Sequence, residues 1–141
     1  MSKRELITQH IINQLNTVRY INSVSREPKT LEELGRADFP HCLIETANET
    51  RTDSSFSDSK RKHATLDILI NIVVHGADRD KQRNSVIEAI EEKLDADTTM
   101  GGNAHDAGVT SIEIREIGEA EPYATAAMVY TVEYYYERTK T

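Results

Sequence analysis

The chain has 141 residues, a formal net charge of -7 and a single cysteine, Cys42. The length predicts one domain with its own core, and 38% hydrophobic with 29% charged residues is typical of a globular protein, not a disordered one. No apolar run is long enough for a membrane span. One cysteine excludes an internal disulfide, and the polar N-terminal residues lack a signal-peptide core, so we expect folding in a reducing cytosol.

The charge is distributed unevenly along the chain. Residues 1–63 contain 10 Lys and Arg against 9 Asp and Glu, whereas residues 64–141 contain 7 against 15. A surface that grips nucleic acid needs the opposite sign. The acidic half therefore indicates solubility, a basic partner, or a surface to which nucleic acid does not adhere.

The first expected element is a helix over residues 2–18. Ser2 is suited to cap it, and Glu5 follows at the spacing of a capping box. Apolar residues recur on one face, and the polar opposite face is either solvated or in contact with another subunit. The apolar stripe consists of Ile7, Ile11, Leu15 and Val18.

Short elements should follow this helix. Residues 20–24 favour a short strand, and residues 30–35 favour one helical turn that Gly35 would end. Pro40 restricts the residue before it to extended conformations. The strand expected after it, residues 41–46, alternates, with Cys42, Ile44 and Thr46 on one side.

The segment 48–62 is long and polar, with Phe56 as its apolar residue. It is either a loop, the default for a long polar connection, or the tip of a long β-hairpin that joins the strands around Ile44 and Ile68. A hairpin would project Phe56 and a basic cluster away from the body, as an assembly would require. The basic cluster is Lys60, Arg61 and Lys62.

The stretch 64–99 carries the clearest structural pattern, a strand that leads into an amphipathic helix. Alternate residues of the strand should form the core: Leu66, Ile68, Ile70, Ile72 and Val74. The helix is expected over residues 80–96, with Val86, Ile87, Ile90 and Leu94 as its buried stripe.

Two further strands are expected at residues 109–117 and 123–136, and the short acidic connection between them predicts antiparallel pairing. The tyrosines of the last strand, Tyr130 and Tyr134 to Tyr136, suit either an interface or the rim of a core. Together the elements predict one α+β domain over residues 1–141, in the order α-β-β-β-α-β-β. We expect a mainly antiparallel sheet of four to five strands, two helices packed on it, and a long hairpin-like arm.

The sequence contains no convincing catalytic or metal-binding motif. His41 adjoins Cys42, but neighbouring residues of a strand point to opposite faces, so we expect Cys42 to be a small buried hydrophobe. The five histidines lack zinc-site spacing, and residues 95–99 lack the glycine and glutamate of a calcium loop. We therefore expect no enzyme activity, no cofactor and no metal.

The layout nevertheless resembles a known family over nearly the whole chain. Phe39-Pro40 precedes a strand, the strand 61–74 follows a long polar excursion, and a helix ends in Leu94 to Gly102 with the run Asp-Thr-Thr-Met-Gly-Gly. The closing strand ends in Tyr130-Thr131-Val132-Glu133-Tyr134. This pattern resembles the tail terminator (minor tail, or tail completion) proteins of tailed bacteriophages.

The resemblance implies a structural virion protein. Such proteins form a ring, usually a homohexamer, that caps the head-proximal end of the tail tube, ends tube polymerisation and provides the docking surface for the head connector. The implied partners are further copies of the chain, the tail tube protein, the head connector or neck protein, and a sheath protein if the tail is contractile. Genome DNA would pass through the ring without specific binding. The implied location is the neck-proximal end of the tail, after assembly in the host cytoplasm.

Two groups of site residues follow from the resemblance. The wall of the hole tends to be acidic, and its candidates here are Glu113, Glu116, Glu119 and Glu121, for which plain solvated surface is the alternative. The second group would form an arm that contacts the adjacent tube ring or subunit, for which a mobile surface loop is the alternative. The arm residues are Arg51, Phe56, Lys60, Arg61 and Lys62.

Two other functions remain open at this point. One is a head-closure or head–tail joining protein that binds the connector instead of the tube. The other belongs to a different class, a small enzyme or ligand-binding α+β domain with a defined pocket.

Overall fold

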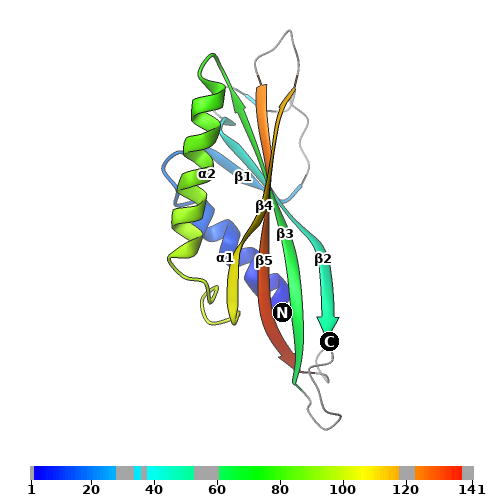
Figure 1. The fold of residues 1–141 in the computed structure, drawn as a ribbon. Helices are drawn as coiled ribbons and strands as arrows, with labels where there is room; N and C mark the ends of the chain where they lie inside the picture. Colours follow the sequence, from blue (N-terminus) through cyan, green and yellow to red (C-terminus); the bar gives the residue numbers. More distant parts are fainter. Residues whose placement is uncertain (1, 28–33, 36–37, 53–60, 118–122, 138–141) are drawn as a thin grey trace.

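The protein folds into one five-stranded sheet with two helices on the same face (Figure 1). The computed structural model describes residues 2–27, 34–35, 38–52, 61–117 and 123–137. The elements are α1 (Lys3–Leu15), β1 (Ser23–Ser25), β2 (His41–Thr52), β3 (Arg61–His75), α2 (Arg79–Asp95), β4 (Asp106–Ile117) and β5 (Tyr123–Glu137).

The strands lie in the order β1-β2-β3-β5-β4, so β3 is the central strand. The short β1 is parallel to β2, and every other neighbouring pair is antiparallel. This arrangement confirms the predicted α+β class and the predicted order of elements. It also confirms that the last two strands pair with each other.

The core lies between the sheet and the helices, and it is built on alternate residues of β3. The residues of β3 that face the helices are at most 1% exposed: Leu66, Ile68, Ile70, Ile72 and Val74. The stripes predicted for the two helices, which include Ile11 of α1 and Ile90 of α2, pack against them. The opposite face of β3 is half-buried, and neither helix covers it (Figure 1).

Helix α1 starts where the capping pattern predicts. The Oγ of Ser2 accepts a hydrogen bond from the backbone N–H of Glu5 at 3.1 Å. The Glu5 side chain pairs with Arg26 instead of returning to the cap, so half of the capping box forms. The helix ends earlier than predicted, because the backbone N–H groups of Thr17 and Val18 turn back to carbonyls three residues away.

The position of β1 differs from the sequence prediction. The strand spans Ser23–Ser25, and Tyr20, expected inside it, is 59% exposed. Parallel pairing with the start of β2 fixes the strand, together with a hydrogen bond from the N–H of Asn22 to the carbonyl of Pro40. Because these partners are remote in sequence, a prediction from local strand propensity alone placed β1 at the wrong residues. Most of the helical turn expected at residues 30–35 lies outside the described residues.

The β2–β3 connection is a long hairpin up to the pair Thr52 and His63. Its tip, residues 53–60, lies outside the described part of the chain. The end of β5 also pairs with β3 as far as Arg61 and Glu137. The base of the arm is therefore a three-stranded part of the body.

The predicted alternation of β2 holds as far as Thr46, which the register sets opposite Ile68, on the same side as Cys42 and Ile44, although the Thr46 side chain is exposed. The register between β2 and β3 then shifts between Thr46 and Glu49. A shift of this kind adds a residue to one strand, which changes which side chains reach each face beyond it.

Two isoleucine substitutions test the location of the core. Ile70 is fully buried, whereas Ile114 is 54% exposed. We expect Ile70→Ala to lower the free energy of unfolding by about 2–5 kcal/mol and Ile114→Ala to change it by about 0.5 kcal/mol or less. Urea denaturation of both variants measures the difference, and equal losses would contradict this account of the core.

Candidate functional site

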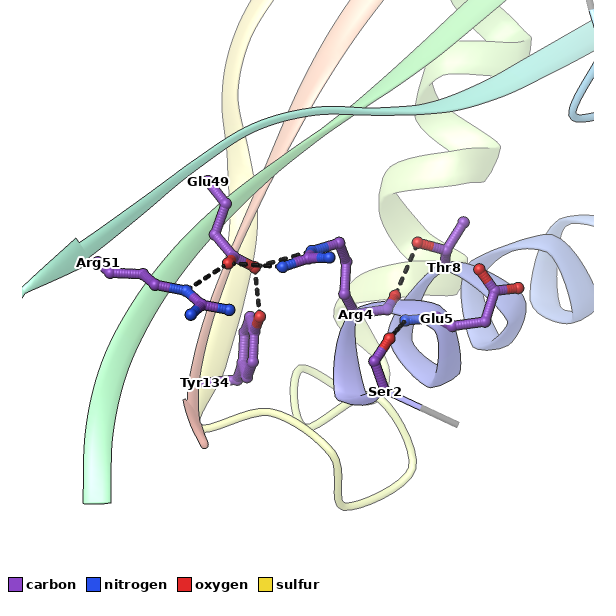
Figure 2. Close-up of polar contacts among 7 residues, drawn as sticks. All are labelled: Ser2, Arg4, Glu5, Thr8, Glu49, Arg51 and Tyr134. Atoms are coloured by element: carbon purple, nitrogen blue, oxygen red, sulfur yellow. Dashed lines mark hydrogen bonds and ion pairs between the residues drawn. The ribbon is translucent and has the colours of Figure 1, made fainter. Parts of the chain in front are cut away.

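A polar cluster lies on the helix side of the sheet, at the base of the β2–β3 hairpin (Figure 2). The carboxylate of Glu49 accepts hydrogen bonds from Arg4 at 3.1 Å (Nε) and 2.9 Å (Nη2) and from the Nε of Arg51 at 2.8 Å. The hydroxyl of Tyr134 also donates to it. We call Arg4, Glu49, Arg51 and Tyr134 the Glu49 cluster; it joins α1, β2 and β5.

The local folding of each element explains why these side chains meet. The register shift of β2 sets Glu49 opposite the buried Leu66, on the face that the helices cover. Arg4 lies in the first turn of α1 and reaches towards that face (Figure 2). Tyr134 is 2% exposed, so its ring belongs to the core while its hydroxyl reaches the carboxylate.

The environment of Glu49 favours its ionised form. Burial is the largest single effect and disfavours the charge, but the hydrogen bonds from Arg4, Tyr134 and Arg51 together outweigh it and lower the pKa of Glu49 to about 2. Burial and then the bond to Glu49 raise the pKa of Tyr134 to about 12. Glu49 therefore stays ionised, and Tyr134 stays protonated and able to donate, over the ordinary pH range.

Arg51 makes one further contact, in which its guanidinium lies 4.1 Å from the centroid of the Tyr136 ring. The Arg4 and Arg51 side chains remain 42% and 39% exposed. Two guanidinium groups around one carboxylate leave one positive charge at this surface. The arrangement can hold elements together and attract an acidic partner, but it contains no nucleophile or general base.

The other face of the sheet, which we call the open face, carries mostly negative charge. Its described charged side chains on the strands are the carboxylates of Glu45, Asp67, Asp106, Glu113 and Glu133 and the guanidinium of Arg115. Neighbouring polar groups orient two of them: Asn71 donates to Glu45 at 3.3 Å, and Thr131 donates to Asp67 at 2.9 Å. This face would repel a polyanion such as a phosphate backbone.

The structure separates the four predicted wall residues. Glu113 is exposed on the open face, where it pairs with Arg115. The register sets Glu113 opposite Ala127 but Glu116 opposite the buried Ala124, so the backbone places the two residues on opposite faces of the sheet. Glu119 and Glu121 lie outside the described residues. A wall role for these four residues stays a prediction.

The predicted arm residues are also dispersed. Arg51 belongs to the Glu49 cluster, and Arg61 starts β3. Lys62 is 8% exposed, so its side chain does not project from the body in the way that the hairpin alternative implied. Phe56 and Lys60 lie outside the described residues. Whether these residues contact a partner stays a prediction.

The described residues give little support to a catalytic site. Cys42 is fully buried, and burial raises the pKa of its thiol to about 12. His41 is 3% exposed, and its ring nitrogens lie 2.5 Å and 3.1 Å from the hydroxyls of Ser23 and Ser25, which fix β1 to β2. In the described part of the chain, no three His, Cys, Asp or Glu side chains are grouped for a metal ion. Within the same residues, neither helix is long and apolar enough to cross a membrane.

Sequence reasoning missed the Glu49 cluster almost entirely. Arg4 and Glu49 are separated by 45 positions, and Glu49 and Tyr134 by 85. Arg51 was assigned to an arm, and Glu49 fell within a segment interpreted as polar connection. The one usable signal was the tyrosine-rich end of β5, since a buried tyrosine needs a partner for its hydroxyl.

Comparisons with known proteins identify a similar fold but do not assign the chain to a family. No protein-family model matches the chain, and no curated protein does. Among solved structures, a chain of the "virion of native gene transfer agent (GTA) particle" is 10% identical with a TM-score of 0.52, and the match covers 92% of each chain. The type 4 fimbrial biogenesis protein PilO from Pseudomonas aeruginosa is 10% identical with a TM-score of 0.36, over 95% of this chain and 67% of that one. The chain therefore has the same fold as a protein of a gene transfer agent virion.

The Glu49 cluster predicts a pH dependence of stability. The pKa of Glu49 in the folded protein, about 2, is below its ordinary value of 4.5, so its contribution is complete above about pH 4.5 and is lost as the pH falls towards 2. We expect Glu49→Gln to lower the free energy of unfolding by about 1.5–3 kcal/mol at pH 7 and by progressively less towards pH 2. Urea denaturation over this pH range measures the effect.

The control for this prediction is Glu88→Gln, which makes the same chemical change on the exposed side of α2. That variant should follow the wild type at every pH. A constant difference between Glu49→Gln and the wild type from pH 7 to pH 2 would contradict the assigned role of the Glu49 carboxylate.

Proposed function

We propose that the protein is a structural component of a phage-type virion and acts there as a tail terminator. In this role, copies of the chain form a ring on the head-proximal end of the tail tube, end its polymerisation and offer a docking surface to the head connector. The observation that carries the proposal is the open face of the sheet, which neither helix covers and on which, among the described side chains, five carboxylates accompany one guanidinium.

The electrostatics of the open face suit a wall along which DNA slides. Duplex DNA is densely charged, and a protein binds it by neutralising phosphates with Lys and Arg. A face with excess carboxylates does the opposite, so it keeps a passing duplex in the middle of a hole. We infer that this face, together with Glu119 and Glu121 in the connection after β4, lines the hole of the ring.

Two further observations support a virion role. A chain of a gene transfer agent virion has the same fold over 92% of both chains. The closing strand and the junction after α2 resemble those of tail terminators, as noted from the sequence. The partners of this role are other copies of the chain, the tail tube protein and the head connector, and the hairpin tip would lie on the adjacent ring or subunit.

The main test is electron microscopy of tails assembled without this protein. If the protein ends tube growth, we expect tubes of uncontrolled length, because nothing would then stop the addition of tube subunits. Tails of normal length that lack heads would overturn the length-control role, and would instead favour a head-closure or head–tail joining protein.

A charge reversal tests the wall assignment. We expect Glu119→Lys combined with Glu121→Lys to leave folding intact and to slow DNA passage, because the added lysines would attract phosphates. Circular dichroism checks the fold, and the rate of DNA release from particles gives the readout. The matched control is Glu88→Lys with Glu92→Lys, the same change in charge on the exposed side of α2. Unchanged DNA release and infectivity in the first variant would refute the assignment.

A further inference from the structure

Besides the short β1, the sheet has two long strand edges without a neighbour in the part of the chain that the structure describes. At one end of the sheet, β4 pairs with β5 and presents its other edge outward. At the opposite end, β1 covers β2 from His41 to Leu43, which leaves the outer edge of Ile44–Thr52 without a strand partner among the described residues. Such edges carry unpaired N–H and C=O groups and are templates for another strand.

The edge at β4 also exposes large apolar side chains. Ile112 and Ile114 are 38% and 54% exposed, and the register sets them opposite the buried Met128 and Ala126, on the helix side of the sheet. Exposed isoleucines beside an open strand edge are typical of a surface that another chain covers.

The directions of the strands determine how two copies can join. Since β2, β3, β5 and β4 are antiparallel from each neighbour to the next, β2 and β4 run in opposite directions. If β4 of one copy lies against β2 of the next, the antiparallel sheet continues and the open faces stay on the same side. The pair then retains one free β2 edge and one free β4 edge, so the contact repeats head to tail and can close into a ring.

Charge selects the register of this contact. Glu45, on the free part of β2, and Arg115, on β4, both lie on the open face. If Glu45 lies opposite Arg115, an ion pair forms across the contact, and Thr46 comes beside the exposed Ile114. A slip of two residues would instead bring Glu45 opposite Glu113, and like charges directly opposite each other destabilise a sheet.

We propose that copies of this chain join head to tail, with β4 of one copy paired to Ile44–Thr52 of the next and Glu45 opposite Arg115. The proposal rests on the proposed function, which supplies the reason why copies of the chain assemble. It names the contact surface, its partner and its register.

Cysteine cross-linking tests this contact. In tails purified from cells that make the double variant Glu45→Cys with Arg115→Cys, oxidation should give a ladder of covalent multimers on a non-reducing gel. Each single variant should stay monomeric on the gel, and a mixture of the two should give covalent dimers and nothing larger. Cys42 is fully buried, so it does not interfere.

The outcomes separate this contact from the proposed function. Immunoblotting shows whether the chain is in the tails, and its absence there would refute the function; the same oxidation of concentrated soluble protein would then test the contact. If the chain is present and the double variant gives no ladder, copies join elsewhere. Dimers from Arg115→Cys alone would indicate two-fold pairing of β4 with β4 and would overturn the head-to-tail arrangement.

A charge exchange provides a second measurement. Arg115→Glu and Glu45→Arg, each alone, should lower the infectious titre by about tenfold or more, because each places like charges across a repeated contact. The double variant should regain most of the titre, since the ion pair re-forms in the reverse sense. Failure of the double variant to exceed both single variants would overturn the register.

Discussion

The structure depends above all on the burial of alternate side chains of β3. Leu66, Ile68, Ile70, Ile72 and Val74 are almost inaccessible to solvent, and apolar burial of this kind supplies the main favourable free energy of folding. Both neighbouring strands pair with β3 over most of its length, and both helices pack on the same face. The remaining elements are held through these contacts, and the opposite face is left free of the helices.

The parts of the fold with strong periodicity could be predicted from sequence, and the parts fixed by remote partners could not. The alternation in β3 and the stripe of α2 gave both elements almost to the residue, because each pattern reports burial directly. β1 was misplaced because its pairing with β2 decides its position. The Glu49 cluster was missed because its hydrogen bonds join α1, β2 and β5, and the register shift that turns Glu49 towards α1 has no mark in the sequence.

Carboxylates have different electrostatic environments on the two faces of the sheet. On the helix side, Glu49 is surrounded by two arginines and a tyrosine hydroxyl. Its charge is therefore compensated, and its hydrogen bonds link α1, β2 and β5. On the open face, the described side chains include five carboxylates and one guanidinium, which leaves most of the negative charge of these groups uncompensated. Compensated charges act over a few ångströms, whereas uncompensated ones create a field that a distant polyanion senses. The first arrangement serves stability and the second serves a passing partner.

The pairing of β3 with β5 also sets the timing of folding during synthesis. β3 ends at His75, but its neighbour β5 is complete only at Glu137. The ribosome adds about 5–20 residues per second, so the central strand waits several seconds for one of its two neighbours. β4 has no strand to pair with until β5 arrives, and its outer edge therefore takes shape last. A growing chain cannot present that edge before β5 has been made, which limits edge-to-edge pairing through β4 between chains that are still being synthesised.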